Sequence, residues 1–205
     1  MNATTPDELL PLFPLQTVLF PGGELRLRIF EQRYIDLVRN SIRLGRGFGI
    51  PPIRHGNEAG VPATPYPIGT LAHITDWNQG SDGLLGIVVE GSKRFQILET
   101  SLGPSGLLMA RAAWLPEPEP QPVPTQFQYL ADLLQSLFEL VPAAQTTTGT
   151  TLGASAALVY RLAERLPLSV EQCVTLLTMT ATERQLAFCE EQLERLVKRA
   201  PGDLH

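Results

Sequence analysis

The chain is poor in the residues on which most catalytic and metal sites depend. Its 205 residues include two cysteines and three histidines, and its only lysines are Lys93 and Lys198. Neither lysine follows a G-x-x-x-x-G run, which excludes a phosphate-binding loop of the Walker A type. The cysteines and histidines show none of the CxxC or HExxH spacings that bind zinc. We therefore expect neither a metal nor a cofactor.

The remaining bases and nucleophiles do not form a catalytic group. His205 is terminal, and His55 lies in a stretch rich in proline and glycine. His73 lies in a predicted strand, where its spacing from Asp76 places the two side chains on opposite faces. Ser105 lies in Gly-Pro-Ser-Gly, which is typical of a turn. We predict that the chain is not an enzyme, and a hydrolase with an unrecognised site is the least supported alternative.

Long hydrophobic runs are also absent. No stretch reaches the roughly 18 apolar residues that a membrane-spanning helix requires. The first residues include acids and prolines where a signal peptide needs basic and unbroken apolar segments. Cys173 and Cys189 fall on apolar stripes of predicted helices, which favours reduced, buried thiols over a disulfide. We predict a cytoplasmic protein with no membrane partner.

The stretch from Leu10 to Tyr34 is the most informative part of the chain. Apolar residues from Leu12 to Phe20 predict a buried strand. Pro-Gly-Gly at 21–23 then forces a turn, because proline lacks an N–H and glycine permits positive φ. Residues 25–29 alternate apolar side chains with arginine, which is typical of a strand with one buried and one wet face.

The next elements extend this pattern into a small sheet with one helix. Helical spacing of apolar residues predicts a helix over about 31–44, ended by Gly45. Residues 51–67 lack periodicity and are predicted to be a loop. Further strands are predicted near 47–50, 68–77, 84–90, 94–100 and 107–114, with turns at 80–83 and 91–92. Together with the opening strands they predict a closed or nearly closed sheet.

Prolines at every second position from Pro116 to Pro124 mark a boundary, because such a run favours an extended spacer. Period-two patterning precedes it and 3.6-residue periodicity follows it. We predict a β-rich domain with one helix over 1–115, a linker over 116–124 and a helical domain over 125–205. The predicted class is therefore α+β.

The helical domain contains two sequences that fit the capping box. These are Ser169 with Gln172 and Thr182 with Gln185, and each predicts a helix start. The last helix is predicted to turn the following residues inward: Leu186, Cys189, Leu193, Leu196 and Val197.

Several separated motifs occur in one order along the chain. They are PLFPL at 11–15, FPG at 20–22, IFE-x-RY at 29–34, GTLA at 69–72, VEG-x-x-RF at 89–95 and LPLS at 166–169. In this order they resemble the amino-terminal, substrate-binding domain of the ATP-dependent Lon protease family, over about residues 10–199. The resemblance implies a pseudo-barrel similar to the PUA fold, followed by a helical bundle. The ATPase motif and the serine–lysine dyad of the larger family members are missing.

The resemblance therefore implies a non-enzymatic module that binds unfolded or extended polypeptide, as an adaptor to a separate protease or chaperone. Such binding uses apolar grooves and exposed strand edges, because an added strand gains main-chain hydrogen bonds with many sequences. The residues predicted to contact polypeptide are Phe20, Pro21, Arg33, Tyr34, Trp77 and Trp114.

A cluster of arginines supports an alternative interpretation. The residues predicted to bind anions are Arg26, Arg28, Arg39 and Arg43. Such a cluster fits an RNA-binding, PUA-like module. The isoelectric point near 5.2 opposes this alternative, because phosphate binding needs several cationic contacts. We do not expect a nucleic-acid partner.

Overall fold

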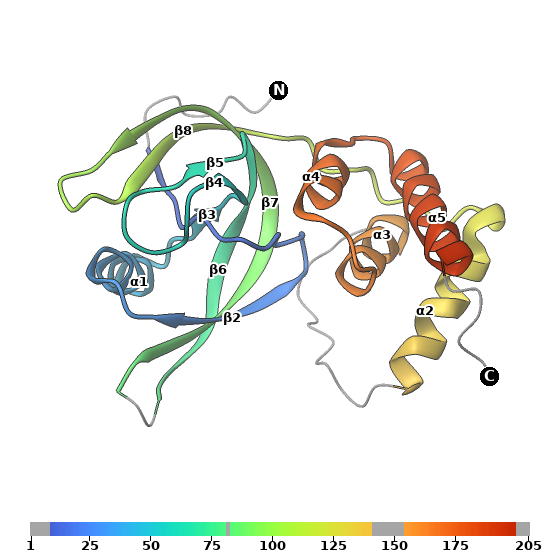
Figure 1. The fold of residues 1–205 in the computed structure, drawn as a ribbon, viewed down its shortest axis with the longest axis horizontal. Coiled ribbons are helices and arrows are strands. Elements are labelled where there is room, and N and C mark those ends of the chain that lie inside the picture. Colours follow the sequence, from blue (N-terminus) through green and yellow to red (C-terminus); the bar gives the residue numbers. More distant parts are fainter. Residues whose placement is uncertain (1–8, 81–82, 141–153, 200–205) are drawn as a thin grey trace. The chain divides into compact units, whose positions relative to one another are not determined.

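The computed structural model of the protein describes residues 9–80, 83–140 and 154–199. The chain divides into two compact units, Met1–Glu117 and Pro118–His205, and the predicted linker at 116–124 spans the division. Strands dominate the first unit and helices the second (Figure 1), which confirms the predicted α+β class.

The first unit is a closed antiparallel barrel. Its sheet has the order β1-β8-β7-β6-β3, and β2 pairs additionally with β7. The strands are β1 (Leu10–Pro11), β2 (Glu24–Ile29), β3 (Phe48–Ile50), β6 (Ile68–Gln79), β7 (Leu85–Leu102) and β8 (Leu108–Trp114). A parallel bridge between Leu12 and Gly49 joins the β1 end of the sheet to β3, and the Phe13 N–H donates to the Gly49 carbonyl at 2.8 Å. The predicted pseudo-barrel is thus confirmed, because the sheet returns to its first strand.

Strand β7 is the central element of the barrel. β6 pairs with one edge of β7, while β2 and β8 pair in succession with the other edge. Gly91 lies where that edge changes partner: its N–H donates to Gly23 O at 2.9 Å, and its carbonyl accepts from Gly22 N at 2.8 Å. A Cβ at Gly91 would collide with the Phe20 carbonyl oxygen. The turn predicted at 91–92 is therefore wrong, because this glycine permits a close approach inside a continuous strand.

Two other predictions for the first unit need correction. Most of the opening strand predicted from Leu12 to Phe20 is irregular, because Pro14 lacks an N–H group and the apolar residues bridge to different segments in turn, Leu12 to Gly49 and Leu15 to Pro52. The loop predicted at 51–67 contains a small hairpin of β4 (Ile53–His55) and β5 (Thr64–Pro65). The turn predicted at 80–83 lies partly outside the described residues.

Helix α1 (Gln32–Leu44) packs its inner face into the barrel core, as predicted. It begins after Glu31 and ends at Gly45, which adopts the left-handed conformation at φ 61°. The ring of Tyr34 stacks on that of Phe13, with centroids 4.0 Å apart. The buried cluster comprises Phe13, Leu15, Leu19, Ile29, Tyr34, Leu37, Val38, Phe48, Ile50, Ala72, Ile87 and Val89.

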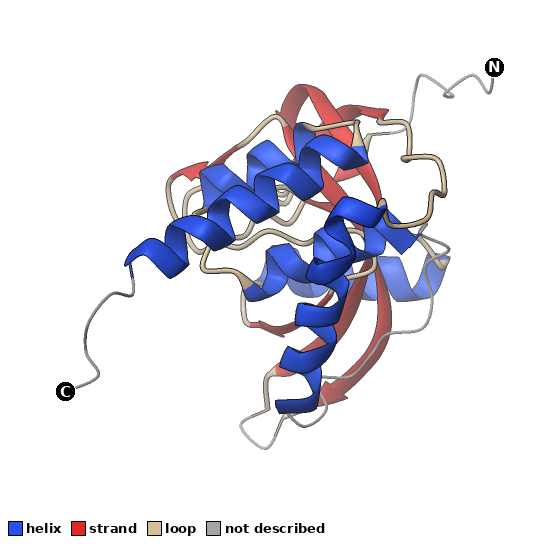
Figure 2. Cartoon of the chain, turned by 90° about the vertical axis from the view of Figure 1, so that its right-hand side faces the viewer, coloured by secondary structure: helices blue, strands red, loops and turns tan. Residues whose placement is uncertain are grey.

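In its described part the second unit contains helices joined by irregular segments and no strand. Figure 2 colours all helices of the chain blue. Its elements are η1 (Thr125–Phe127), α2 (Gln128–Leu140), α3 (Ala154–Arg165), α4 (Val170–Thr178) and α5 (Thr182–Arg199). The Ser155 hydroxyl donates to the carbonyls of Gln121 and Pro122, at 2.9 and 2.6 Å. The start of α3 is thereby bonded to the proline-rich segment.

The two predicted capping boxes have different outcomes. At α4 the Ser169 and Gln172 box is complete in both directions. Gln185 instead is fully buried, and its amide donates to Leu176 O at 2.9 Å and to Met179 O at 3.3 Å. The second box is wrong, because Gln185 satisfies carbonyls at the end of α4 rather than the start of its own helix.

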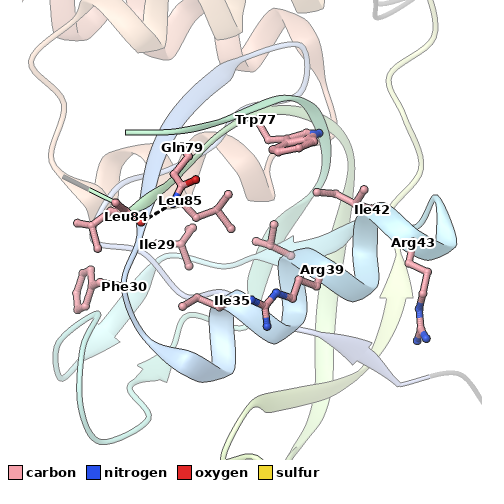
Figure 3. A pocket seen from close by; sticks show the side chains of 12 residues that line it. Ile29, Phe30, Ile35, Arg39, Ile42, Arg43, Trp77, Gln79, Leu84 and Leu85 are labelled. Atoms are coloured by element: carbon pink, nitrogen blue, oxygen red, sulfur yellow. Dashed lines mark hydrogen bonds between the residues drawn. The ribbon is translucent and has the colours of Figure 1, made fainter. Parts of the chain in front are cut away.

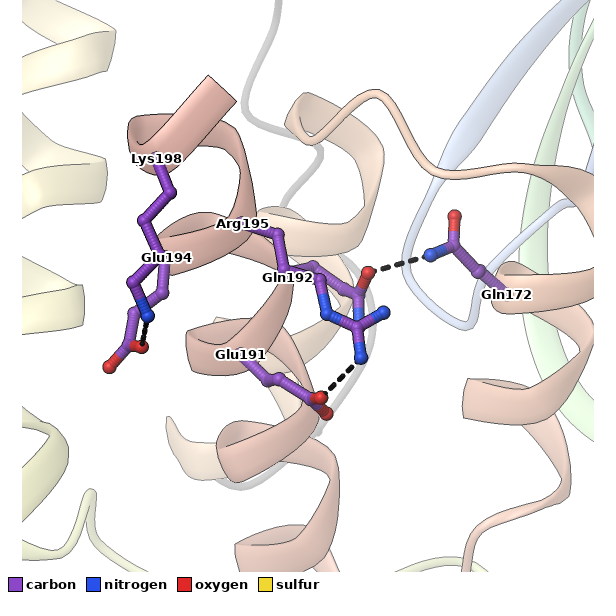
Figure 4. A network of polar contacts seen from close by, with 6 residues as sticks. All are labelled: Gln172, Glu191, Gln192, Glu194, Arg195 and Lys198. Carbon is purple, nitrogen blue, oxygen red and sulfur yellow. Dashed lines mark hydrogen bonds and ion pairs between the residues drawn. The ribbon is translucent and has the colours of Figure 1, made fainter. Parts of the chain in front are cut away.

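The inner face of α5 is confirmed for Leu186 and Cys189, which are both fully buried. Val197 is 68% exposed, so its predicted inward position is wrong. Figure 4 shows the polar face of this helix, with Arg195 bonded to Glu191 at 2.6 Å. In the same view the Gln172 amide donates to Gln192 Oε1 at 2.6 Å, which ties α4 to α5.

Both cysteines are free thiols. Burial raises the pKa of Cys189 to about 12 and the pKa of Cys173 to about 11. Among the described helices, none has both the length and the apolar composition needed to cross a bilayer.

Candidate functional site

Four of the six residues predicted to contact polypeptide belong to the packed interior of the first unit. Phe20 is 2% exposed, Tyr34 is 7% exposed, and Pro21 is buried. The Arg33 side chain is 9% exposed, forms an ion pair with Glu31 at 2.8 Å and lies 4.7 Å from the Tyr34 ring centroid. Burial raises the pKa of Tyr34. These residues are therefore not accessible to a partner in this conformation.

The two tryptophans are exposed but line separate cavities. Trp114 is 42% exposed, packs edge-on against Phe95 and lies in a cavity with Leu44 and His73. Trp77 is 59% exposed and lies in a different cavity, between α1 and the hairpin of β6 and β7. The structure therefore does not bring the two predicted aromatic anchors together.

The cavity at Trp77, here called the Trp77 groove, has a volume of about 550 Å³. It is lined by Ile29, Phe30, Ile35, Val38, Arg39, Ile42, Arg43, Trp77, Gln79, Gly83, Leu84 and Leu85. Figure 3 shows Trp77 on the hairpin side and Ile42 on the facing helix. At the hairpin end the Gln79 amide donates to Gly83 O at 3.5 Å.

The strand register explains why this groove is apolar. Trp77 pairs with Ile87, and Gln79 pairs with Leu85. Directly paired residues in an antiparallel sheet project from the same face, so Trp77 continues the face on which Ile87 is buried. Trp77 itself is largely exposed. An apolar side chain on the face that elsewhere forms the core is therefore in contact with solvent.

The groove also borders an edge of the sheet. β3 pairs with β6 at residues 70–72, from Phe48↔Ala72 to Ile50↔Thr70. Within the described residues, no strand lies beside the outer edge of β6 from His73 to Gln79. An extended chain beside this edge can form main-chain hydrogen bonds with its unpaired groups. The Trp77 N–H itself already donates to Asp76 Oδ1 at 2.8 Å.

The four arginines predicted to bind anions are divided between two cavities. Arg39 and Arg43 line the Trp77 groove, on one side of α1. Arg26 and Arg28 line a cavity that also contains the carboxylates of Glu31 and Glu58. The predicted single cluster is thus split, and only the pair on α1 lies beside an exposed tryptophan.

The sequence interpretation missed several residues of the groove. Phe30 is 62% exposed and Ile42 is 44% exposed. Leu84 and Leu85 complete the apolar lining from the hairpin. One signal was available: α1 carries Ile35 and Ile42 in addition to a complete buried face at Tyr34, Leu37, Val38 and Ser41. A helix with apolar residues beyond its core face has a second apolar contact surface.

Among the residues that the structure describes, no three His, Cys, Asp or Glu side chains gather as metal ligands. Ser105 lies in a turn, where Gly106 N donates to Gly103 O at 2.9 Å. The features available for binding are apolar side chains, a strand edge and two arginines.

Architecture and site together define an α+β protein in which a closed barrel with a surface groove precedes a helical unit. A model of the ATP-dependent protease La (LON) substrate-binding domain matches residues 9–195. The chain belongs to this family.

Individual comparisons agree with that assignment. The crystal structure of a Lon N-terminal domain protein from Xanthomonas campestris is 32% identical, with a TM-score of 0.73, and the match covers 95% of this chain and 100% of that one. The N-terminal domain of the Mycobacterium avium complex Lon protease shares the fold at 18% identity, with a TM-score of 0.62, 90% of this chain and 97% of that one being covered.

The curated relatives are much longer proteins. Lon protease 2 of Myxococcus xanthus is 31% identical over 101 residues, which are 48% of this chain and 12% of the relative. Protein cereblon of Xenopus tropicalis is 28% identical over 123 residues, which are 58% of this chain and 26% of the relative. The chain thus matches about an eighth of the length of the Lon protease and about a quarter of cereblon.

Proposed function

We propose that the protein is a non-enzymatic, cytoplasmic module that binds unfolded or extended polypeptide segments in the Trp77 groove. Membership of the LON substrate-binding domain family supports polypeptide recognition in general. The observation that carries the assignment to this groove is the exposed Trp77 beside an open edge of β6. The two free thiols are consistent with a reducing compartment.

Binding in this groove combines two contributions. The apolar side chains of Phe30, Ile42 and Trp77 leave water when a partner side chain enters, which is favourable at about 25 cal/mol per Å² of apolar surface buried. Main-chain hydrogen bonds along β6 add affinity without demanding one sequence. The cost of ordering a flexible segment opposes both terms, so we expect dissociation constants on the order of tens of micromolar.

Binding in this groove should hold the polypeptide for another protein and should not cleave it. The only lysines, Lys93 and Lys198, follow no phosphate-binding loop. Lys93 lies in β7, and Lys198 bonds to Glu194 at 2.9 Å in α5. We propose that the protein holds a client for a separate protease or chaperone, as an adaptor. Purified protein is accordingly expected to hydrolyse neither ATP nor peptides.

Fluorescence anisotropy of a labelled, reduced and carboxamidomethylated protein, which is permanently unfolded, tests the proposal. We expect saturable binding. Trp77→Ala should weaken this binding about tenfold, because the variant loses one well-packed aromatic contact. Trp114→Ala is the matched control and is expected to change the affinity less than about twofold.

Two outcomes would contradict the proposal in different ways. No saturable binding up to about ten times the expected dissociation constant would remove the polypeptide-binding function. Equal losses for Trp77→Ala and Trp114→Ala would remove the assignment to the Trp77 groove. An RNA oligonucleotide added as competitor should not release the labelled protein, whereas release would favour the RNA-binding alternative.

A further inference from the structure

The arginines of the Trp77 groove differ from three others in the first unit in how they are paired. Arg26, Arg33 and Arg111 each have a carboxylate within 3.5 Å, from Glu24, Glu31 and Glu99 respectively. Each of these guanidinium groups therefore shares its charge with a carboxylate of the protein itself, most closely in the Arg33 and Arg111 pairs at 2.8 and 2.9 Å.

Arg39 has only a distant acidic neighbour. Its Nη1 lies 3.8 Å from Oδ1 of Asp36, and the same Asp36 oxygen accepts a hydrogen bond from the Gln32 amide at 2.9 Å. The Arg39 side chain is 71% exposed. An exposed pair at this distance is weak, so Arg39 keeps most of its five N–H donors for a partner.

Arg43 is bonded to a neutral group. Its Nη2 donates to Oδ1 of Asn40 at 3.0 Å, and no carboxylate of the described residues lies within ion-pair distance of it. Arg39 and Arg43 are four residues apart, so they project from the same side of α1. In Figure 3 the Arg39 side chain extends toward Ile35, and the Arg43 side chain points away from Trp77. The described lining of the groove includes these two cations and no acidic residue.

We propose that the Trp77 groove selects extended segments in which a large apolar side chain is accompanied by acidic residues. The apolar side chain packs against Trp77 and Ile42, while the carboxylates bind Arg39 and Arg43, whose planar donors match a carboxylate. The cavity with Arg26 and Arg28 differs from this groove, because its lining contains Glu31 and Glu58. This inference rests on the proposed function and adds the chemical class of the segment bound.

Tryptophan fluorescence provides a direct test, because Trp114→Phe leaves Trp77 as the only tryptophan. The probes are two short synthetic peptides: one has a Leu-Phe pair flanked by glutamates, and the other has glutamines in their place. In the Trp114→Phe protein we expect the glutamate peptide to bind several-fold more tightly at low salt, and the difference to shrink as salt is added.

Three variants locate the effect on α1. Arg39→Glu/Arg43→Glu should weaken binding of the glutamate peptide about tenfold. Each substitution turns an attraction into a repulsion, which should lower the affinity about threefold. Arg43→Glu should have part of that effect. Arg54→Glu makes the same charge change on β4, outside the groove lining, and should alter binding less than about twofold.

The outcomes separate this inference from the proposed function. Equal affinity for the two peptides, or an Arg54→Glu loss as large as that of Arg43→Glu, would overturn the acidic preference while binding of unfolded protein persists. Failure of both peptides and of unfolded protein would overturn the proposed function itself. Tighter binding of an RNA oligonucleotide than of the glutamate peptide, lost in Arg39→Glu/Arg43→Glu, would show that these arginines serve phosphate instead and would also overturn the inference.

Discussion

Replacing Gly91 by alanine tests the proposed reason for the glycine at the centre of β7. The new methyl group would collide with the Phe20 carbonyl oxygen and lie 3.0 Å from Leu19 Cγ. The Phe20 backbone cannot move aside freely, because Gly23 N donates to Phe20 O at 2.9 Å, next to the two bonds between residues 22–23 and Gly91. The substitution must therefore strain several main-chain hydrogen bonds at once.

The magnitude follows from these contacts. Overpacking at a closely packed site costs about 1–3 kcal/mol, and each strained hydrogen bond up to about 1 kcal/mol more. Alanine also lowers the conformational entropy of the unfolded chain, and this effect stabilises the folded state by about 0.4–1 kcal/mol. We expect Gly91→Ala to lower the free energy of unfolding of the first unit by about 2–3 kcal/mol, or its Tm by about 4 °C or more per kcal/mol.

Urea unfolding followed by tryptophan fluorescence measures this change selectively, because Trp77 and Trp114 are the only tryptophans and both lie in the first unit. Gly103→Ala is the matched control. A Cβ at Gly103 would meet its nearest neighbour, Leu107 O, at an ordinary 3.5 Å. A difference between the two variants of less than about 0.5 kcal/mol would refute the close-approach argument.

Two further predictions concern the second unit. Gln185→Ala should destabilise it by about 1–3 kcal/mol, because the carbonyls of Leu176 and Met179 lose a buried donor; helical circular dichroism in urea should show this loss, with the exposed Gln135→Ala near neutral, and equal effects would contradict it. Cys173 and Cys189 should resist a disulfide reagent until the protein unfolds. Their folded pKa values of about 11 and about 12 exceed the ordinary 9.0, so stability should fall as pH rises above about 9, where only the unfolded thiols ionise. Rapid labelling of native protein at pH 8, or stability that rises above pH 9, would contradict this reasoning.

Local signals in the sequence predict much of the fold. Alternation over residues 25–29 predicts most of β2 (Glu24–Ile29), and the Ser169 and Gln172 box predicts the start of α4. Such features involve neighbouring residues and need no tertiary information. Gly91 is different, because a glycine permits either a turn or a close approach, and only the position of Phe20 decides between them. Gln185 likewise depends on a carbonyl supplied by another helix.

The lining of the Trp77 groove was predicted only in part for a related reason. Trp77 and Ile87 are both apolar residues on the same face of the sheet. Nevertheless Trp77 is 59% exposed and Ile87 is 2% exposed. The difference is set by how far α1 covers that face, which periodicity does not encode. Phe20 and Tyr34 show the converse: motif residues of the family resemblance are buried and support the fold. Arg39 and Arg43 were found through charge, but their separation from Arg26 and Arg28 required the tertiary structure.

The pairing of β1 with β8 has a consequence for synthesis of the protein. Leu10 lies opposite Ala110, so nearly the entire first unit separates these partners along the chain. During synthesis on a ribosome, β1 leaves the exit tunnel long before β8 does. The pairing of β1 with β8 therefore cannot form until β8 emerges. During that interval the apolar PLFPL segment needs temporary protection, and a stalled or truncated nascent chain lacking β8 should be degraded or held by chaperones.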